Sequence, residues 1–231
     1  MPRLPRAPLN FLFPPRCLAC RRRGAFLCSS CLRDIERIPD PFCPACDRLV
    51  DPETPVCRCR APAPLFVLAA GPYQGPLRKA IHSFKYQGQR AGAADLAALM
   101  VPQARRLPAG EPRIVPVPLH QRRELARGYN QSALLARALA RHLEVGSHDR
   151  ALSRVRHTAP QVGLNRVARA HNLRDAFTAD PKHCREHTIV LIDDVCTTGA
   201  TLHAAAEAAL AAGAARVYAL VLARAVPGED R

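Results

Sequence analysis

Four consecutive apolar residues, Ile189–Ile192, are followed directly by two acidic residues, Asp193 and Asp194. Consecutive apolar residues without polar alternation are typical of a strand buried on both faces of a parallel sheet. A loop of hydroxyl-bearing and small residues follows at 197–201, and an alanine-rich stretch predicts a helix from about Leu202 to Ala212. The pattern therefore predicts a strand, an acidic turn, a small-residue loop and a helix, in that order.

Further strands and helices alternate along residues 65–223. Hydrophobic periodicity predicts strands at Leu65–Ala70, Arg113–Pro118 and Arg216–Ala223, and helices near Gly75–Tyr86, Gly92–Arg106 and Gln131–His142. Alternating strands and helices indicate an α/β fold with a parallel sheet, in which ligands bind at the carboxyl ends of the strands. A loop at 119–131 is expected on the same edge of the sheet as the acidic pair.

The acidic turn and the loop after it have complementary chemistry. The amides at a helix start are unpaired and favour an anion, and the loop residues Thr197, Thr198, Gly199, Ala200 and Thr201 supply hydroxyls and close backbone approach. Two adjacent carboxylates repel a phosphate, but they suit vicinal sugar hydroxyls, a metal ion or a developing cation. A phosphorylated sugar satisfies both halves, although an ordinary strand-turn-helix with an acidic turn remains the alternative.

The stretch Val190–Leu202 resembles the phosphoribosyl pyrophosphate (PRPP) signature of type I phosphoribosyltransferases, with the acidic pair and the Thr/Gly loop all present. The resemblance implies that Asp193 and Asp194 hold the ribose hydroxyls and that the loop holds the 5-phosphate. It also implies Mg²⁺, bound together with PRPP. Such a motif is far more specific than a lone glycine pattern.

Eight of the ten cysteines fall within residues 17–59, in four closely spaced pairs. Two thiolates on one tight turn form a zinc knuckle, and two knuckles complete a tetrahedral site. Pairing in sequence order predicts two Cys₄ zinc ions, the first held by Cys17, Cys20, Cys28 and Cys31, the second by Cys43, Cys46, Cys57 and Cys59. A crossed pairing, disulfides and a ribbon that has lost its zinc remain open. Four thiolates leave no position for a substrate, so the predicted zinc is structural.

Proline-rich sequence separates the cysteines from the α/β pattern. Pro62 and Pro64 mark the linker, so we expect a Cys-rich module at 1–62 and a larger domain at 63–231. No segment reaches the roughly 18 apolar residues of a membrane span, and the amino terminus lacks the features of a secretory signal. We therefore expect a cytoplasmic protein without membrane insertion. Because the cytoplasm is reducing, its cysteines indicate metal ligands rather than disulfides.

Positive charge is concentrated in the middle of the chain. The formal net charge is +15, and residues 113–174 hold twelve arginines and no lysine against three acidic residues. Guanidinium groups bind phosphate and pyrophosphate oxygens in a multidentate manner. The candidates for these contacts are Arg122, Arg123, Arg127 and Arg156.

Three further segments extend the resemblance over nearly the whole chain. These are Val-Pro-Val-Pro with Arg-Gly-Tyr-Asn-Gln at 115–131, Arg-x-Arg-x-Thr-x-x-Gln-x-x-Leu at 154–164, and Ala176-Phe177. Together with the cysteine pairs and the PRPP signature they resemble the ComF/GntX family, in which an amino-terminal zinc ribbon precedes a phosphoribosyltransferase-like domain. The resemblance implies a pyrophosphate loop at 116–123, a mobile covering loop at 154–172, and a link to natural transformation and the handling of single-stranded DNA.

Two functional hypotheses follow. In the first, the protein transfers a phosphoribosyl group from PRPP to an unidentified acceptor, with Asp193, Asp194 and Arg156 acting at the reacting centre. In the second, the protein keeps the fold without turnover and binds single-stranded DNA or competence proteins, which the basic charge favours. The sequence identifies no acceptor pocket, so both hypotheses stand.

Overall fold

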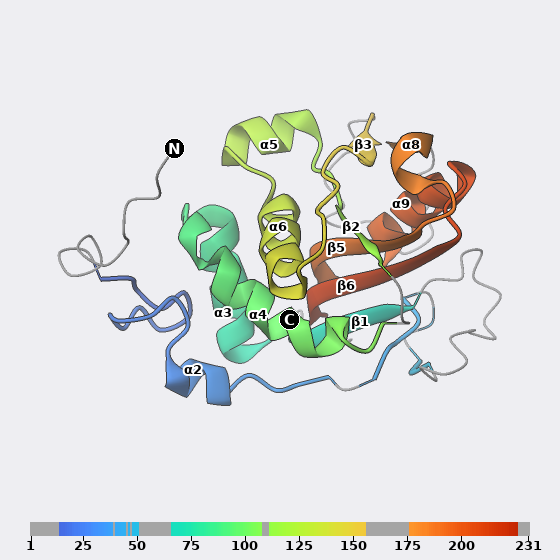
Figure 1. The fold of residues 1–231 in the computed structure, drawn as a ribbon. Helices are drawn as coiled ribbons and strands as arrows, with labels where there is room; N and C mark the ends of the chain where they lie inside the picture. Colours follow the sequence, from blue (N-terminus) through green and yellow to red (C-terminus); the bar gives the residue numbers. More distant parts are fainter. Residues whose placement is uncertain are drawn as a thin grey trace.

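The computed structural model describes residues 14–38, 40–44, 46, 48–50, 66–107, 111–155 and 176–225. Within these residues a parallel sheet of four strands runs in the order β1-β6-β5-β2 (Figure 1). This arrangement confirms the predicted α/β fold. The elements are α2 (Ser29–Arg33), β1 (Val67–Pro72), α3 (Gly75–Tyr86), η1 (Arg90–Gly92), α4 (Ala93–Ala104), β2 (Arg113–Pro116), α5 (Gln121–Arg127), α6 (Gln131–Leu143), β3 (Leu152–Arg154), β4 (Phe177–Ala179), α8 (Pro181–Cys184), β5 (Thr188–Cys196), α9 (Ala200–Ala211) and β6 (Arg216–Arg224).

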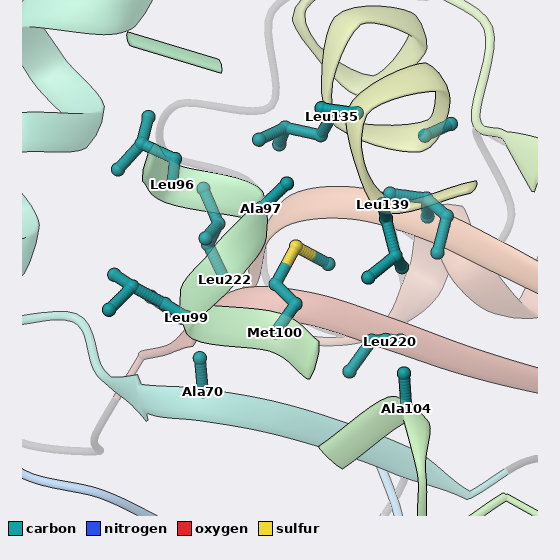
Figure 2. Packing of buried hydrophobic residues seen from close by; sticks show 14 of the residues in the cluster. Ala70, Leu96, Ala97, Leu99, Met100, Ala104, Leu135, Leu139, Leu220 and Leu222 are labelled. Carbon is teal, nitrogen blue, oxygen red and sulfur yellow. The ribbon is translucent and has the colours of Figure 1, made fainter. Parts of the chain in front are cut away.

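The two faces of the sheet carry separate hydrophobic clusters. Alternate residues of β5 divide between them, with Val190 and Ile192 on one face and Ile189 and Leu191 on the other. Helices α3, α4 and α6 cover the first face, and α9 covers the second. Figure 2 shows the first cluster, where Met100 of α4 lies among leucines of α6 and β6. Because both faces are covered, the central strands are apolar without alternation, as the sequence predicted.

Strand β5 is longer than the sequence predicted. It pairs with β6 as far as Cys196, opposite Arg224, so Asp193 and Asp194 lie within the strand rather than in a turn after it. Strand β2 pairs with β5 on the other side, with Pro116 opposite Ile192. The chain after β2 therefore begins beside the acidic pair, as expected for neighbouring parallel strands.

The segment at 119–131 contains a short helix where a loop was expected. Helix α5 begins after His120, whose ring Nδ1 accepts a hydrogen bond from the amide of Arg122 at 3.2 Å. It ends at Gly128, which has the left-handed φ of 78° that glycine adopts without a steric cost. No residue of α5 is buried, so its arginines are displayed rather than packed.

The described cysteine-rich residues pack against the larger domain. Leu18 and Leu27 belong to the first hydrophobic cluster, and Phe42 belongs to the second. The amide of Phe42 donates to the carbonyl of Val67 at 3.0 Å, and the amide of Val67 donates back at 2.9 Å, so Phe42 pairs with the free edge of β1. The predicted boundary at residue 62 lies outside the described residues.

Among the described helices, none has both the length and the apolar character needed to cross a bilayer.

Candidate functional site

The candidate site lies where β5 ends and α9 begins. Gly199 connects them with a left-handed φ of 71° and, as the N-cap residue of α9, has no side chain with which to cap the first amides of the helix. Those amides, together with the helix dipole, favour an anion at this position. Thr197 is exposed, and Thr198, Ala200 and Thr201 are half-buried. The structure therefore brings all five predicted loop residues together beside the acidic pair.

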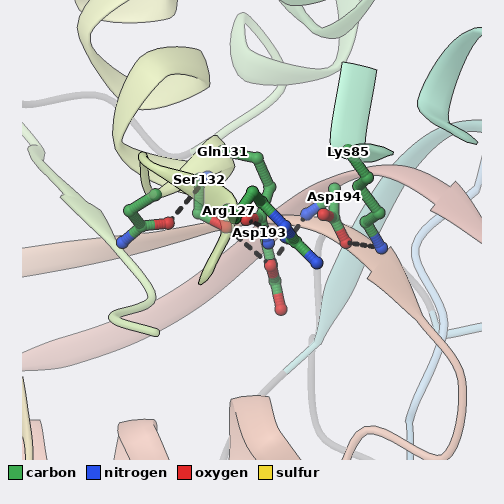
Figure 3. A network of polar contacts seen from close by, with 7 residues as sticks. Lys85, Arg127, Gln131, Ser132, Asp193 and Asp194 are labelled. Atoms are coloured by element: carbon green, nitrogen blue, oxygen red, sulfur yellow. Dashed lines mark hydrogen bonds and ion pairs between the residues drawn. The ribbon is translucent and has the colours of Figure 1, made fainter. Parts of the chain in front are cut away.

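Asp193 is held by the start of α6 (Figure 3). The hydroxyl of Ser132 donates to its Oδ1 at 2.7 Å, and the amide of Asp194 donates to the same oxygen at 2.9 Å. Ser132 is itself positioned by Asn130, whose side chain accepts from the Ser132 amide at 3.0 Å and caps α6. Burial, and then the negative charge of Asp194, raise the pKa of Asp193 to about 7.

Asp194 points the other way, toward Lys85 at the carboxyl end of α3 (Figure 3). The Lys85 ammonium lies 2.8 Å from Asp194 Oδ1, and the two side chains are 16% and 5% exposed. Burial by itself would lower the pKa of Lys85, but the carboxylates of Asp194 and Asp193 raise it above its ordinary value. The lysine therefore stays charged and neutralises one of the two acids.

One oxygen of this ion pair has no hydrogen-bond partner among the residues that the structure describes. Asp194 Oδ2 is buried and accepts no hydrogen bond from the residues that the structure describes. A buried carboxylate oxygen without a donor costs free energy, so such atoms commonly mark places where a ligand or ion binds. Asp194 can accept from a hydroxyl or contact a cation at Oδ2 without giving up Lys85.

The arginines of α5 surround the other side of the site. Arg122 and Arg123 are exposed, whereas Arg127 is half-buried. The guanidinium of Arg127 donates to the side chain of Gln131 and lies 5.2 Å from the ring centre of Tyr86. All three predicted arginines are thus displayed on one short helix, and contacts with Gln131 and Tyr86 fix Arg127 in place.

Arg154 is the last of the arginines within residues 113–174 that the structure describes. It is half-buried, and its guanidinium lies 5.3 Å from the ring centre of Phe177. Burial, and then the positive charge of Arg123, lower its pKa, while Asp193 acts in the opposite direction. Arg154 therefore lies within electrostatic range of both α5 and the acidic pair. Arg156, predicted at the reacting centre, lies outside the described residues.

The cysteine-rich region reaches the loop at 197–201 through Pro44, which lies between Cys43 and Cys46. A Cβ atom built on Gly199 would lie 2.2 Å from the Cβ of Pro44, much closer than two carbon atoms approach in folded proteins. Gly199 is therefore required for its left-handed backbone and also for the close approach of this proline. The guanidinium of Arg224 lies 4.3 Å from the ring centre of Phe42 and fixes the same segment against the end of β6.

The first predicted zinc site is assembled. The sulfur atoms of Cys17, Cys20, Cys28 and Cys31 all lie within 4.8 Å of one another. Cys20 and Cys28 have their sulfurs 3.6 Å apart, close to the separation of about 3.8 Å that tetrahedral Zn–S bonds of about 2.3 Å require. The donor set therefore fits a closed structural zinc ion. In the second set, Cys57 and Cys59 lie outside the described residues, so its pairing stays a prediction.

Lys85, Ser132 and Pro44 were not predicted as site residues. Lys85 carried a usable signal, because it is one of only three lysines among 34 basic residues in a chain that otherwise uses arginine. Ser132 and Pro44 carried none, since each reaches the site only through the pairing of distant segments.

Two family models match the chain. The phosphoribosyl transferase domain matches residues 130–230, and the double zinc ribbon domain matches residues 8–60. Together with the parallel sheet and the four clustered sulfurs, these matches define a zinc-ribbon protein with a phosphoribosyltransferase-like domain.

Relatives match over most of their length. DNA utilization protein YhgH of Salmonella typhi is 35% identical over 224 residues, which covers 91% of this chain and 97% of that protein. Competence protein F of Haemophilus influenzae is 34% identical over 214 residues, or 84% of this chain and 90% of that protein. Competence protein ComFC of Bacillus subtilis is 29% identical over 208 residues, or 82% and 80%. The chain belongs to the ComF/GntX family of competence and DNA utilization proteins.

Proposed function

We propose that the site binds PRPP or a related phosphorylated ribose together with Mg²⁺. The observation that carries this proposal is the buried Asp194 Oδ2, which has no donor among the described residues and lies in the strand leading to the Gly199 loop. Asp194 Oδ2 requires a hydrogen-bond donor, and the amides at the start of α9 beside it favour an anion. A ribose phosphate offers both groups. Asp193 and Asp194 accept from the ribose hydroxyls, and the loop at 197–201 holds the 5-phosphate.

The acidic pair also fits the metal. Mg²⁺ prefers oxygen ligands and retains several waters, so carboxylate oxygens with one open position suit it. When bound with PRPP, Mg²⁺ neutralises charge on the pyrophosphate oxygens. Lys85 stays paired with Asp194, so the protein holds this carboxylate in place whether or not a ligand is bound.

Transfer of the phosphoribosyl group would follow from the same arrangement. The bond from C1 of the ribose to pyrophosphate breaks, and its electron pair leaves with the pyrophosphate. A lone pair of the acceptor forms the new bond to C1, and the acceptor's proton passes to solvent. Arg123, Arg127 and Arg156 stabilise the departing charge, while the acidic pair faces the developing positive charge on the sugar. The acceptor is unidentified, so binding is proposed ahead of turnover.

Calorimetric titration with PRPP, with and without Mg²⁺, tests the binding site. We expect the wild type to bind PRPP and the Asp194→Asn variant to bind it at least tenfold more weakly. In the variant, Oδ2 is either replaced by an amide nitrogen, which cannot accept, or remains as an uncharged amide oxygen. The surface variant Glu111→Gln, which changes an exposed acid, is the matched control. Equal binding by wild type and Asp194→Asn refutes the site. A screen for pyrophosphate release across candidate bases then tests transfer.

The zinc ribbon has a structural role in this proposal. Two Cys₄ zinc ions hold a segment with little hydrophobic core of its own, the first at the clustered sulfurs and the second at Cys43, Cys46, Cys57 and Cys59. A cytoplasmic location follows from the same use of cysteine. In this proposal the chain divides into a Cys-rich unit at 1–62 and a larger domain at 63–231, and the Cys-rich unit packs on the sheet.

A second candidate function is the binding of single-stranded DNA, with competence proteins as further partners. The relatives' names, DNA utilization protein and Competence protein F, favour it, as does the formal charge of +15. Salt-dependent binding of single-stranded oligonucleotides tests it, and affinity that does not change with salt counts against it. Arg156, Arg166 and Arg169, which add to the basic charge of the middle of the chain, lie outside the described residues.

A further inference from the structure

The exposed face of α3 carries basic and aromatic side chains and no acid. Arg78, His82 and Tyr86 recur every four residues, so they share one face of the helix, and Lys79 lies beside them. All four are exposed, and Tyr86 retains 64% of its accessible surface although it is a large ring. An aromatic ring that keeps most of its surface exposed among cations is a platform on which a nucleobase can stack.

Two cavities flank this helix and continue the same chemistry. The first, of about 540 Å³, lies between the first zinc knuckle and α3, and Arg21, Arg78 and Lys79 contribute to its lining. The second, of about 500 Å³, lies between the end of α3 and α5, and Tyr86, Arg123 and Arg127 contribute to it. No carboxylate side chain is among the residues that line either cavity. His82 lines the first cavity and Tyr86 the second, and their ring centres are 4.9 Å apart, so the helix face connects the two cavities.

Contacts between the cations and the rings hold this surface in shape. The ring centres of His82 and Tyr86 are 4.9 Å apart, and the guanidinium of Arg127 lies 5.2 Å from the ring centre of Tyr86. Arg78 lies 5.7 Å from the ring centre of Tyr73. Tyr73 and Tyr86 are thus each close to a guanidinium group, which can contact a phosphate next to a stacked base.

Arg21 separately indicates that the first zinc knuckle contributes to the basic surface beside α3. It follows Cys20 directly and has a left-handed φ of 66°, a conformation that costs a non-glycine residue backbone energy. Glycine would adopt it freely, yet the chain has an arginine whose guanidinium donates to the side chain of Gln87 just beyond α3. Backbone strain of this kind is typical of functional positions, so it indicates that the Arg21 side chain has a function.

We propose that the α3 track, formed by Arg21, Arg78, Lys79, His82 and Tyr86, binds a single-stranded nucleic acid and leads it toward the acidic pair. The track rests on the second candidate function and gives it a location. Helix α3 has twelve residues and is about 18 Å long, which suits a short stretch of nucleotides, at the lower end of the range for single-strand binding folds, about 4 to 16. Lys85, at the end of the helix, connects the track to Asp194.

Fluorescence anisotropy of a labelled oligothymidylate across a salt series tests the track. For wild type, the logarithm of the affinity should fall linearly with the logarithm of the salt concentration. The triple variant Arg21→Ala/Arg78→Ala/Lys79→Ala should reduce that slope by about 2, since each phosphate contact on a single strand contributes about 0.7. Tyr86→Ala should weaken binding about 5- to 150-fold, whereas Tyr86→Phe should retain it.

The matched control removes the same charge elsewhere. Arg105→Ala/Arg141→Ala/Arg216→Ala changes three exposed arginines that line neither cavity, and it should leave affinity and slope within twofold of wild type. Equal losses in the two triple variants, no oligonucleotide binding at low salt, or tighter binding of the matching duplex would overturn the proposal. Titration of the track variant with PRPP keeps the two sites distinguishable, because PRPP binding should be unchanged in it.

Discussion

Replacing Lys85 by methionine should destabilise the protein by leaving the Asp194 carboxylate buried without its counter-ion. The two side chains are 16% and 5% exposed and their charged atoms lie 2.8 Å apart. Removing one partner of a buried ion pair costs about 3–5 kcal/mol, and the residual exposure of Lys85 places this pair near about 3 kcal/mol. In a chain of this size each kcal/mol lowers the melting temperature by about 2–4 °C, so we expect a loss of roughly 6–12 °C.

A double-mutant cycle separates the ion pair from the packing of the lysine stem. Urea unfolding of Lys85→Met, Asp194→Asn and the combined variant gives the three free energies that are needed. The combined variant should recover most of the stability that Lys85→Met loses, because no buried charge remains unpaired. A Lys85→Met variant that unfolds within about 1 kcal/mol of wild type, or single losses that simply add, would refute the assignment of Lys85 as the counter-ion.

Three further predictions concern the same site and the zinc knuckles. The pKa of Asp193 is raised to about 7 in the folded protein, so the unfolded chain releases this proton first as the pH rises. The contribution of Asp193 to stability is therefore lost between about pH 4 and pH 7, by up to about 1.4 kcal/mol per pH unit, and urea unfolding of Asp193→Asn should lack this slope. Metal analysis should give about two zinc ions per chain, and Cys28→Ser should remove about one of them; iron or no metal would contradict the ribbon assignment. Gly199→Ala should lower the melting temperature more than Gly88→Ala does. Both glycines have a positive φ, but of the two only Gly199 has an atom, from Pro44, within 4 Å of the added Cβ. Equal losses would show that the Pro44 contact is unimportant.

The sheet and its helices could be predicted because their signals are local. Residues Ile189–Ile192 are apolar without alternation and become the centre of β5, buried on both faces. Helices α3 and α6 follow the predicted bounds within one residue, since periodicity and turn residues mark both ends. The first cysteine set is also local, and its four sulfurs come together as the spacing predicted.

The details that complete the site could not be predicted, because they depend on residues far apart in the chain. Lys85 and Asp194 belong to α3 and β5, and only the packing of the helix on the sheet brings them into contact. The acidic pair was expected to face a ligand as a unit, but each carboxylate has its own protein partner, Ser132 in one case and Lys85 in the other. A motif specifies which residues are present and leaves open how their charges are balanced.

The pairing of Phe42 with β1 has a consequence for how the chain can be divided. A fragment starting at residue 63 would keep every strand, yet it would uncover the outer edge of β1 and remove an aromatic ring from the core. It would also lack the proline that abuts Gly199. Exchanging the Cys-rich segment for that of a relative would therefore change the contacts at β1 and at Gly199 together.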